Sequence, residues 1–489
     1  MHRAWTEFRT RGRIVAVVVA TLLTVLPGLL LAVVDRSTCS AGTVEIPCPT
    51  DPTGPDGTAV RDQFTFAHRP LGREGSVAVR LTSLTGIITY PPPNHDEIVP
   101  GLVPWAKAGL VLKDGIRPGS AYAALVLTAE HGVRMQHDFV HDTAGGPERL
   151  TGPRWLRLTR SGDRVTGDES TDGVRWTTVA AVDLPGLPET VLVGLAVTSP
   201  GDLTLVPTGL GASAGQDRFT QATAVFDSAS VDGVPVSGWT EALIGESGAT
   251  DWEKFHQAPG VVEEGGTVTV TGSGDIGPAS GAGGRTPAGL LVGLVAGLLV
   301  LAVVAARFAA GGDPRARAGV VGAVSFVVGL VAAAVVVPVG SAVLRANGGV
   351  VLPVPWPVLL RVVVGVGVVA AATAVLAFAA AVLLRRAWAA VLVVVAVLLV
   401  PYSVAVVPLL PDEVARWLLR VTPAAGFAVA QTAEEFPQVV AHYAPSTGYF
   451  PLPWWAGLLV LCGYAAAAFG LAFRRHSAAT STDLAAQPY

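Results

Sequence analysis

Residues 318–344 read AGVVGAVSFVVGLVAAAVVVPVGSAVL and contain no charged side chain. A hydrocarbon core about 30 Å thick is crossed by about 20 consecutive apolar residues in a helix. Most residues of this stretch are valine, alanine or glycine, and small side chains allow membrane helices to pack closely. The stretch therefore predicts a membrane-spanning helix rather than the core helix of a soluble domain.

Five further runs have the same character, so six spans are predicted. Hydrophobic residues make up 51% of the 489 residues and charged residues only 14%, compared with roughly 25% charged in soluble domains. A mostly polar block, Asp35 to Arg285, separates the first run from the others. The six predicted spans are Ile14–Val34, Ala288–Phe308, Ala318–Leu344, Val358–Leu384, Ala387–Leu410 and Trp454–Phe473.

The first run could instead be a secretory signal peptide, since four arginines precede it. A signal peptide has an apolar region of about 7–15 residues, which is shorter than this run. The run ends at Val33-Val34-Asp35-Arg36, and small residues that would suit cleavage, Ser40-Ala41-Gly42, lie nearby. The length favours a retained helix, and cleavage stays an alternative.

Arginines cluster in alternate connectors, and this pattern predicts the orientation. Short connectors on the cytoplasmic side of a membrane carry an excess of Lys and Arg. We therefore expect a multi-pass plasma-membrane protein with both termini cytoplasmic and residues 35–286 extracellular. The predicted inner side carries Arg3, Arg9, Arg11, Arg13, Arg307, Arg315, Arg317, Arg385, Arg386, Arg474 and Arg475, and the other side Arg345, Arg416 and Arg420.

The polar block predicts an all-β domain. Residues 62–232 contain short runs of alternating apolar and polar side chains between turn residues, a pattern typical of a β-sandwich. Ser76–Leu81, Arg154–Leu158 and Val191–Leu195 are examples, and Asp172-Gly173 has the composition of a hairpin turn. The predicted fold class is a multi-domain membrane protein, in which a six-helix α-helical transmembrane bundle carries an all-β domain inserted between its first and second spans.

These patterns divide the chain into consecutive segments. Residues 35–61 are rich in Pro, Thr, Gly and Asp, which indicates a linker, and Gly266–Thr271 predicts a strand beyond residue 232. The segments are residues 1–13 (cytoplasmic, basic and interfacial N-terminus), 14–34 (first transmembrane helix), 35–61 (extracellular linker), 62–232 (β-sandwich), 233–286 (small extracellular β segment and linker), 287–473 (five-helix transmembrane region) and 474–489 (cytoplasmic tail).

The polar block offers no convincing catalytic or metal-binding set. His137 and His141 are each followed by an aspartate, but on one extended strand they would lie about 13 Å apart, too far to share a metal unless the strand bends. Glu169 and Asp172 could pair as in glycosidases, yet the turn already explains Asp172. We predict no catalytic residue, no metal ligand, no cofactor and no enzymatic activity. Nucleic-acid binding is not expected either, because no basic patch is interleaved with aromatic residues.

Two of the three cysteines flank a short loop beyond the first span. Cys39 and Cys48 would lie in a compartment in which disulfides persist. Cys462 stands alone in the last span and cannot be their partner. The sequence thus offers Cys39–Cys48 as a candidate disulfide, with two free thiols as the alternative.

Several segments of the block follow one another in an informative order. They are Asp62–Phe66, Trp105–Leu110, Gly132–Gln136, Pro153–Leu158, Ser170–Trp176 and Ala224–Val231. They resemble successive strands of a lectin-like jelly-roll domain of the concanavalin A/laminin G-like class, and Gly272–Ile276 resembles the opening of a second copy. The resemblance implies a jelly-roll sandwich but no particular ligand, because this fold hosts many functions.

Three tryptophans are the candidate ligand contacts of this domain. Trp105, Trp155 and Trp176 could stack on sugar rings, which would make a carbohydrate or another cell-envelope molecule the ligand. Tryptophans of a sandwich are more commonly buried in its core, which is the alternative interpretation.

The membrane part also carries segments in an informative order. They are Trp5–Thr10, Val320–Ala334, Arg345–Gly348, Leu383–Arg386, Leu418–Phe427 and Gly448–Pro451. These segments resemble the permease subunits of actinobacterial ABC-2-type transporters. The resemblance implies an ATP-driven exporter with a separate ABC ATPase subunit and a homodimer or heterodimer of permeases. Its candidate contacts to the ATPase are Trp5, Arg9, Arg11, Arg315 and Arg317.

Other features of the sequence bear on this function. The chain has no phosphate-binding loop of the form Gly-x-x-x-x-Gly-Lys-[Ser/Thr], and its spans contain no Asp or Glu of the kind that couples transport to ions. Both features favour an energy source outside the chain.

The inner connector argues against this function, however. Residues Ala309–Arg317 are shorter than the long basic segment of the family and contain Gly-Gly and Asp-Pro, which disfavour a helix. The alternative is therefore a non-transporting membrane protein, derived from a permease, that displays a surface-binding or sensing domain. Glycoside hydrolysis by the β domain is a third hypothesis.

Overall fold

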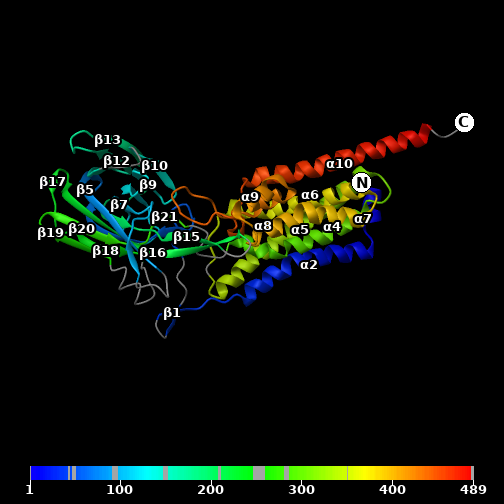
Figure 1. Ribbon diagram of the computed structural model, residues 1–489, viewed down its shortest axis with the longest axis horizontal. Coiled ribbons are helices and arrows are strands. Elements are labelled where there is room, and N and C mark those ends of the chain that lie inside the picture. Colours follow the sequence, from blue (N-terminus) through cyan, green and yellow to red (C-terminus); the bar gives the residue numbers. More distant parts are fainter. Residues whose placement is uncertain are drawn as a thin grey trace.

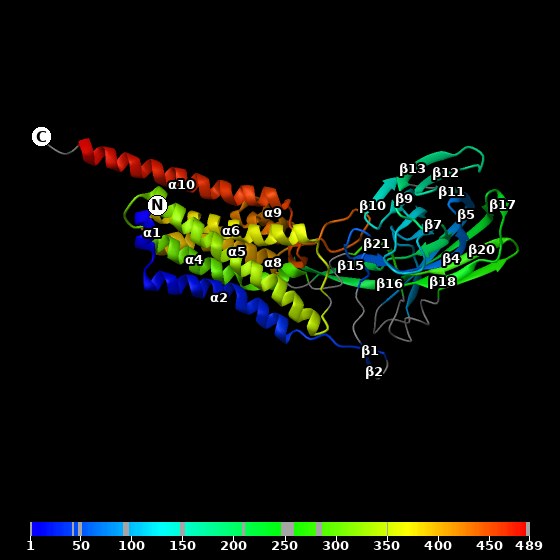
Figure 2. The same cartoon turned by 180° about the vertical axis from the view of Figure 1, so that it is seen from behind.

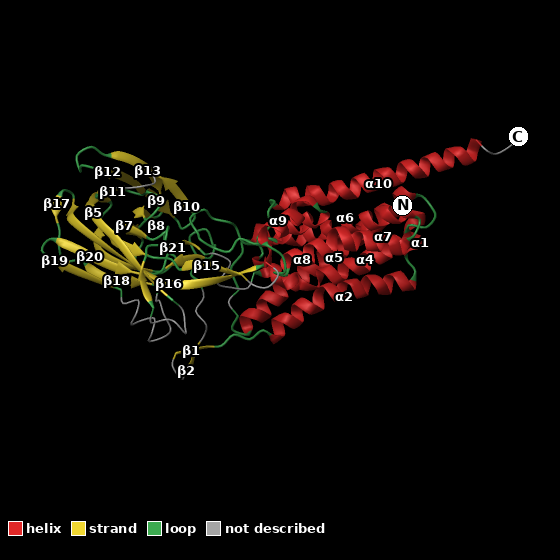
Figure 3. Ribbon diagram, in the orientation of Figure 1, coloured by secondary structure: helices red, strands yellow, loops and turns green. Residues whose placement is uncertain are grey.

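The computed structural model describes residues 2–41, 44–46, 51–90, 97–146, 152–207, 211–245, 259–279, 286–349 and 351–485. An elongated bundle of helices carries a β domain at one end (Figure 1). Seen from behind, the short helix α1 (His2–Phe8) lies at the end of the bundle that is farthest from the β domain (Figure 2). Helices and strands are thus segregated into two bodies (Figure 3).

In the described ranges, six helical segments are long and apolar enough to cross a membrane. This agrees with the six predicted spans and makes the chain a multi-pass membrane protein. The segments are Arg11–Val34 (α2), Pro287–Phe308 (η3, Pro287–Gly293, and α4, Leu294–Phe308), Pro314–Ala346 (α5), Trp356–Leu384 (α6), Ala387–Val406 (α7, η4 and α8) and Trp454–Arg475 within α10 (Trp454–Ala485).

The fifth span is irregular near Pro401. α7 (Ala387–Val394) passes into a π-helical turn, η4 (Val395–Leu399), before α8 (Val400–Val406). Proline lacks the N–H that would bond the carbonyl four residues earlier, and its ring crowds that carbonyl, so a single π turn here relieves the crowding. The helix then ends at Val406, short of the predicted end at Leu410.

α6 is the most enclosed helix of the bundle. In its most apolar window 72% of the residues are buried, against 22% in α2 and 22% in α10. α4, α5 and α10 pack around α6, and the α5–α6 crossing is close. A Cβ added at Gly329 would lie 2.7 Å from the carbonyl oxygen of Val366, so the glycine allows the two backbones to approach.

Two large antiparallel sheets make up most of the β domain. In the described ranges, one sheet has the strand order β10-β9-β8-β7-β14-β4-β18, and the other has β13-β12-β11-β5-β16-β20-β19 with β6, β15 and β17 at its sides. Apolar side chains that point inward from both sheets, such as Val79, Leu110, Leu156 and Phe226, form the core. Alternation along the strands therefore positions one face of each sheet in the core.

The strands have the following bounds: β1 Cys39–Ala41, β2 Val44–Ile46, β3 Val60–Asp62, β4 Phe64–Leu71, β5 Glu74–Thr89, β6 Ile98–Pro100, β7 Lys107–Lys113, β8 Tyr122–Thr128, β9 Val133–His137, β10 His141–Ala144, β11 Arg154–Ser161, β12 Arg164–Ser170, β13 Thr177–Asp183, β14 Val191–Thr198, β15 Asp202–Pro207, β16 Ser213–Val231, β17 Val234–Pro235, β18 Thr240–Ile244, β19 Gly260–Glu264, β20 Thr267–Gly272 and β21 Ile276–Pro278.

Most of the strands beyond residue 232 belong to the same two sheets, whereas β21 pairs with β3. β18 joins the sheet that contains β4, and β19 and β20 join the sheet that contains β16. The expected boundary at residue 232 therefore lies inside the fold. Gly272–Ile276 connects β20 to β21 and does not open a second copy of the domain.

The first and last strands of the main β domain pair with each other. β3 and β21 form an antiparallel ribbon, which we name the closing ribbon. Two lysines of β7 reach it from the neighbouring sheet. Lys113 Nζ lies 2.6 Å from Asp62 Oδ2, and Lys107 Nζ lies 2.9 Å from Asp275 Oδ1. The ribbon thus brings together the two ends of a domain that both connect to membrane helices.

The strand predicted through His137 and His141 is a hairpin instead. The chain reverses at residues 138–140, where Asp138 and Phe139 have φ values of 45° and 68°. β9 and β10 then place the two histidine rings face to face with centroids 4.4 Å apart. Within the described residues, no group of three His, Cys, Asp or Glu side chains gathers in a way that could hold a metal ion.

The hairpin at Asp172-Gly173 is present, but its loop is wider than a two-residue turn. β12 and β13 pair up to Glu169 and Thr177, which leaves residues 171–176 as the loop. The Asp172 carboxylate accepts hydrogen bonds from the backbone N–H groups of Arg175 and Val174, at 2.8 and 2.9 Å. These bonds hold the pKa of Asp172 well below its usual range, so this carboxylate is committed to the turn.

The β domain contacts the bundle through α9 (Asp412–Val421) and the segment 431–453, which contains η6 (Pro445–Thr447). α9 is followed by η5 (Pro423–Ala430), which packs against α10. Gln438 Nε2 donates to the carbonyl oxygen of Val140 at 3.1 Å. Ser213 Oγ donates to Asp412 Oδ2 at 3.1 Å. Side-chain hydrogen bonds therefore link both sheets to the junction.

Candidate functional site

The end of the bundle opposite the β domain gathers most of the predicted ATPase contacts. α1 packs there against the end of α4, because Phe8 is buried and meets the ring of Phe308 edge-on at 5.2 Å. Trp5 stacks on Phe8 at 6.3 Å and remains 44% exposed. The helix breaks at Arg9 and Thr10, and α2 begins at Arg11. Aromatic packing thus holds α1 against the bundle.

Arg317 fastens α1 to the connector between α4 and α5. Its Nη2 donates to Glu7 Oε2 at 2.5 Å and its Nη1 to the carbonyl oxygen of Phe308 at 3.0 Å. Its guanidinium also lies 4.7 Å from the centre of the Phe308 ring. The hydrogen bond from Arg317 lowers the pKa of Glu7, so the carboxylate stays charged. Arg317 is therefore engaged inside the protein and not free for a partner.

Arg315 stands in a different environment on the same connector. It is exposed, and its guanidinium lies 4.0 Å from the centre of the Phe473 ring of α10. Gly311 and Gly312 have φ values of 78° and 70°, which glycine adopts readily. The Asp313 carboxylate accepts from the Arg315 N–H at 3.0 Å and caps α5. The connector is thus a tight turn, as its poor helix propensity predicts.

Three of the predicted contacts remain available at this end. Arg9 and Arg11 are exposed and form no ion pair in the part of the chain that the structure describes. Together with the half-exposed Trp5 they form a surface that we name the basic platform. It can offer an aromatic ring and two cations to an acidic protein surface or to lipid phosphates.

Replacing Arg317 by glutamine is expected to loosen α1. The change removes a charge-assisted hydrogen bond to Glu7 and a cation over the Phe308 ring. Amide hydrogen exchange in α1 should accelerate roughly tenfold or more, which mass spectrometry of peptides from residues 2–13 would measure. The matched control is Arg315→Gln, whose side chain contacts α10 instead. Equal acceleration in both variants would contradict the role assigned to Arg317.

The three tryptophans proposed to stack on sugars have different surroundings. Trp105 is 6% exposed and stacks on His131 at 4.0 Å, so it is a core residue. Trp155 and Trp176 are half-buried on the outer face of the sheet that contains β11. Guanidinium groups already lie near their rings, Arg80 at 5.9 Å from Trp155 and Arg157 at 4.2 Å from Trp176.

Ser213, Asp412 and His442 meet at the junction, although Asp412 lies 199 positions and His442 lies 229 positions after Ser213 in the sequence. These residue types occur in Ser-His-Asp triads, in which the two ring nitrogens serve different partners. Here a single nitrogen, His442 Nε2, lies 2.8 Å from Asp412 Oδ2 and 3.5 Å from Ser213 Oγ. The set therefore joins β16 to α9 by hydrogen bonds, and it lacks the arrangement of a catalytic triad, in which each ring nitrogen serves a different partner. No local sequence pattern links such distant residues.

The cysteines fall into two groups. Cys48 and the side chain of Cys39 lie outside the described residues, so the Cys39–Cys48 disulfide stays a prediction. The backbone of Cys39 begins β1, which pairs with β2. Cys462 is a half-buried free thiol in α10.

No protein-family model and no curated protein matches this chain. Among solved structures, a functionally unknown protein from Saccharomyces cerevisiae is 15% identical with a TM-score of 0.21, covering 35% of this chain and 74% of its own. Scytalido-glutamic peptidase with a transition state analog inhibitor is 12% identical with a TM-score of 0.28, covering 43% and 98%. A GH43 protein from Bacillus licheniformis is 16% identical with a TM-score of 0.19, covering 30% and 26%. No fold or function follows from TM-scores this low.

Proposed function

We propose that the protein is a membrane-spanning permease subunit of an ABC-2-type, ATP-driven exporter. In this proposal the end that bears α1 faces the cytoplasm, and a lectin-like jelly-roll domain, inserted between the first and second spans, lies outside the cell. The arginines support this orientation. More of them flank the spans at the end that bears α1 than at the end that bears the β domain, and short cytoplasmic connectors carry an excess of Lys and Arg.

The basic platform is the observation that carries the proposal. Trp5, Arg9 and Arg11 are exposed beside the α4–α5 connector, at the end where an ATPase would have to meet the spans. The spans contain no Asp or Glu that could couple transport to ions. A separate ATPase is therefore the energy source that fits, and a second permease subunit, identical or related, would complete the transporter.

The connector favours a second candidate function. Arg317 is occupied by Glu7, and residues 309–313 form a tight turn in place of a protruding segment. A partner would find few contacts there beyond Arg315. The alternative is thus a membrane-anchored protein that does not transport and displays the β domain to bind a carbohydrate or another cell-envelope molecule.

Co-expression of the full-length protein with the ABC ATPases of its source genome tests the first proposal. We expect one ATPase to purify with the wild type and to hydrolyse ATP faster in its presence. Arg9→Gln/Arg11→Gln should weaken this association roughly fivefold or more, since each exposed ion pair contributes up to about 1 kcal/mol.

The matched control is Arg345→Gln, an exposed arginine at the opposite end of the bundle, which should leave the association unchanged. If the wild type retains none of the ATPases, the permease proposal fails and the display function is favoured. If the double variant binds as tightly as the wild type, the basic platform is not the coupling surface.

A further inference from the structure

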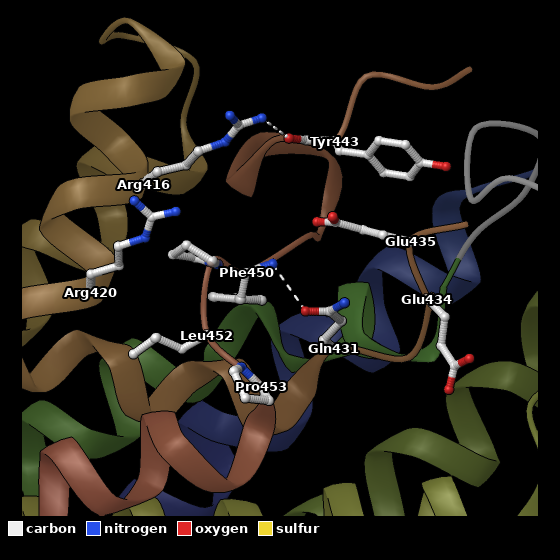
Figure 4. Close-up of a pocket in the computed structure, with 10 residues that line it drawn as sticks. Arg416, Arg420, Gln431, Glu434, Glu435, Tyr443, Phe450, Leu452 and Pro453 are labelled. Atoms are coloured by element: carbon white, nitrogen blue, oxygen red, sulfur yellow. Dashed lines mark hydrogen bonds between the residues drawn. The ribbon is translucent and has the colours of Figure 1, made fainter. Parts of the chain in front are cut away.

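A cavity of about 570 Å³ lies at the junction with the β domain, between α9, the segment 431–453 and the start of α10 (Figure 4). Its floor is apolar, with Phe450 and Leu452, and its walls carry charged side chains. The size is within the range of about 300–1,000 Å³ that is usual for small-molecule sites.

The charges of the cavity are separated by sign. Arg416 and Arg420 project from α9 on one side, and Glu434 and Glu435 project from the segment 431–453 on the other (Figure 4). Arg420 and both glutamates are exposed, and in the described ranges none of these three forms an ion pair. Arg420 and Glu435 thus offer an unpaired cation and an unpaired anion on opposite sides of one cavity, which suits a ligand that carries both charges.

Hydrogen bonds pre-form the cavity. Arg416 Nη2 donates to the carbonyl oxygen of Tyr443 at 2.5 Å, and Arg416 Nη1 donates to Glu413 at 3.0 Å. Gln431 Oε1 accepts from the N–H of Phe450 at 3.0 Å. Tyr443 Oη donates to the carbonyl oxygen of Val439 at 2.9 Å. A wall held in this way needs little ordering when a ligand binds.

The cavity lies at the level of a membrane interface. Trp454 and Trp455 begin the last span and are 41% and 54% exposed, and Trp417 of α9 is 58% exposed. Tryptophan is enriched where membrane spans meet the headgroups. α9 is amphipathic, because Val414, Trp417 and Val421 form an exposed apolar stripe beside the polar stripe that carries Arg416 and Arg420.

We propose that this cavity binds a phospholipid with a primary-amine headgroup, from the leaflet on the β-domain side. The lipid phosphate lies against Arg420, the ammonium lies against Glu435 on the opposite wall, and the acyl chains follow the apolar stripe of α9. Arginine matches phosphate oxygens with paired donors. A primary ammonium offers three donors to carboxylates, a trimethylammonium offers none, and an anionic headgroup would face both glutamates without compensation.

Native mass spectrometry of the purified full-length protein tests the proposal. Phosphatidylethanolamine is expected to bind at least about fivefold more tightly than phosphatidylcholine or phosphatidylglycerol. Arg420→Gln and Glu435→Gln should each abolish this preference. Soluble phosphoethanolamine, which lacks acyl chains, should compete at least about tenfold less strongly than the lipid.

Arg345→Gln is the matched control, because this exposed arginine lies at the same end of the bundle and does not line the cavity. Unchanged thermal unfolding of the variants would exclude misfolding as the cause of a lost preference. Equal binding of the three lipids by the wild type would overturn the proposal. It would also fail if both cavity variants kept the preference, or if phosphoethanolamine competed as well as the lipid. The proposal holds whether or not the protein transports anything.

Discussion

Replacing Lys113 by methionine is expected to destabilise the β domain by about 3–5 kcal/mol, because a buried carboxylate then loses its counter-charge. The side chains of Lys113 and Asp62 are both 0% exposed, and they join β7 to the closing ribbon through a 2.6 Å contact. Lys113 Nζ also donates to the carbonyl oxygen of Ser120 at 3.0 Å. Urea unfolding of the full-length protein, followed by pulse proteolysis of the β domain, measures the loss.

Lys107→Met is the matched control for this variant. Lys107 lies on the same strand and reaches the same ribbon, but the side chain of its partner Asp275 is 15% exposed. Water can solvate the carboxylate that remains, so a smaller loss is expected. Lys113→Met/Asp62→Leu should recover most of the stability, because no buried charge is then left unpaired. If Lys107→Met costs as much as Lys113→Met, complete burial of the pair is not what determines the effect.

The Lys113→Met variant should also depend on pH in a defined direction. Burial raises the pKa of Asp62 above its ordinary value, although Lys113 lowers it in part. Without Lys113 the folded-state pKa rises further. A carboxyl with a raised folded-state pKa contributes full stability below its unfolded pKa of about 3.9, and this contribution is lost as the pH rises through the folded value. The loss in free energy of unfolding of Lys113→Met relative to the wild type, measured in urea, should therefore be small near pH 4 and grow toward neutral pH.

The membrane part could be predicted from the sequence because its main constraint is local. A span must be apolar over the thickness of the bilayer, and each of the six segments carries that property in consecutive residues. The predicted ends fail where backbone chemistry intervenes, as at Pro401, which introduces a π turn and an earlier end to the fifth span.

The pairing of the β strands could not be predicted in the same way. Alternation identifies which residues face a core, and the strands at Ser76–Leu81 and Val191–Leu195 are confirmed. It carries no information on partners, so the pairing of β3 with β21 and of β18 with β4 was not foreseen. The expected boundary at residue 232 was wrong for this reason.

Arg317 illustrates the same limit at the candidate site. In the sequence it stands in a short basic connector and has the features of a free cation for a partner. In the fold its guanidinium meets Glu7, a residue 310 positions earlier. The cavity at Arg420 and Glu435 depends instead on how the chain folds back after α9 and brings the segment 431–453 against it. Charge counts along the chain do not distinguish a free arginine from a paired one.

Gly28→Ala is expected to displace α2 from the bundle, although it adds a single methyl group. A Cβ at Gly28 would lie 2.0 Å from the carbonyl oxygen of Leu290 and 2.8 Å from Cγ2 of Val336. The first contact is with backbone, so it can be relieved only if α2 or η3 shifts. Overpacking of this kind costs about 1–3 kcal/mol and occasionally more, whereas the better helix propensity of alanine returns only about 1 kcal/mol. The unfolding temperature of the purified protein in detergent measures the net effect of these two contributions, and we expect Gly28→Ala to lower it.

Gly463→Ala in α10 separates this packing effect from the intrinsic effect of the substitution. Gly463 also lies inside a membrane helix, but no atom lies within 4 Å of a Cβ placed there. The same chemical change should therefore be neutral or raise the unfolding temperature slightly, since only the propensity term remains. If the two variants unfold at the same temperature, α2 is not packed against η3 as closely as the 2.0 Å approach requires. A lower unfolding temperature for Gly28→Ala alone would show that the first span, although separated from the others by the β domain, depends on their close packing for its place in the bundle.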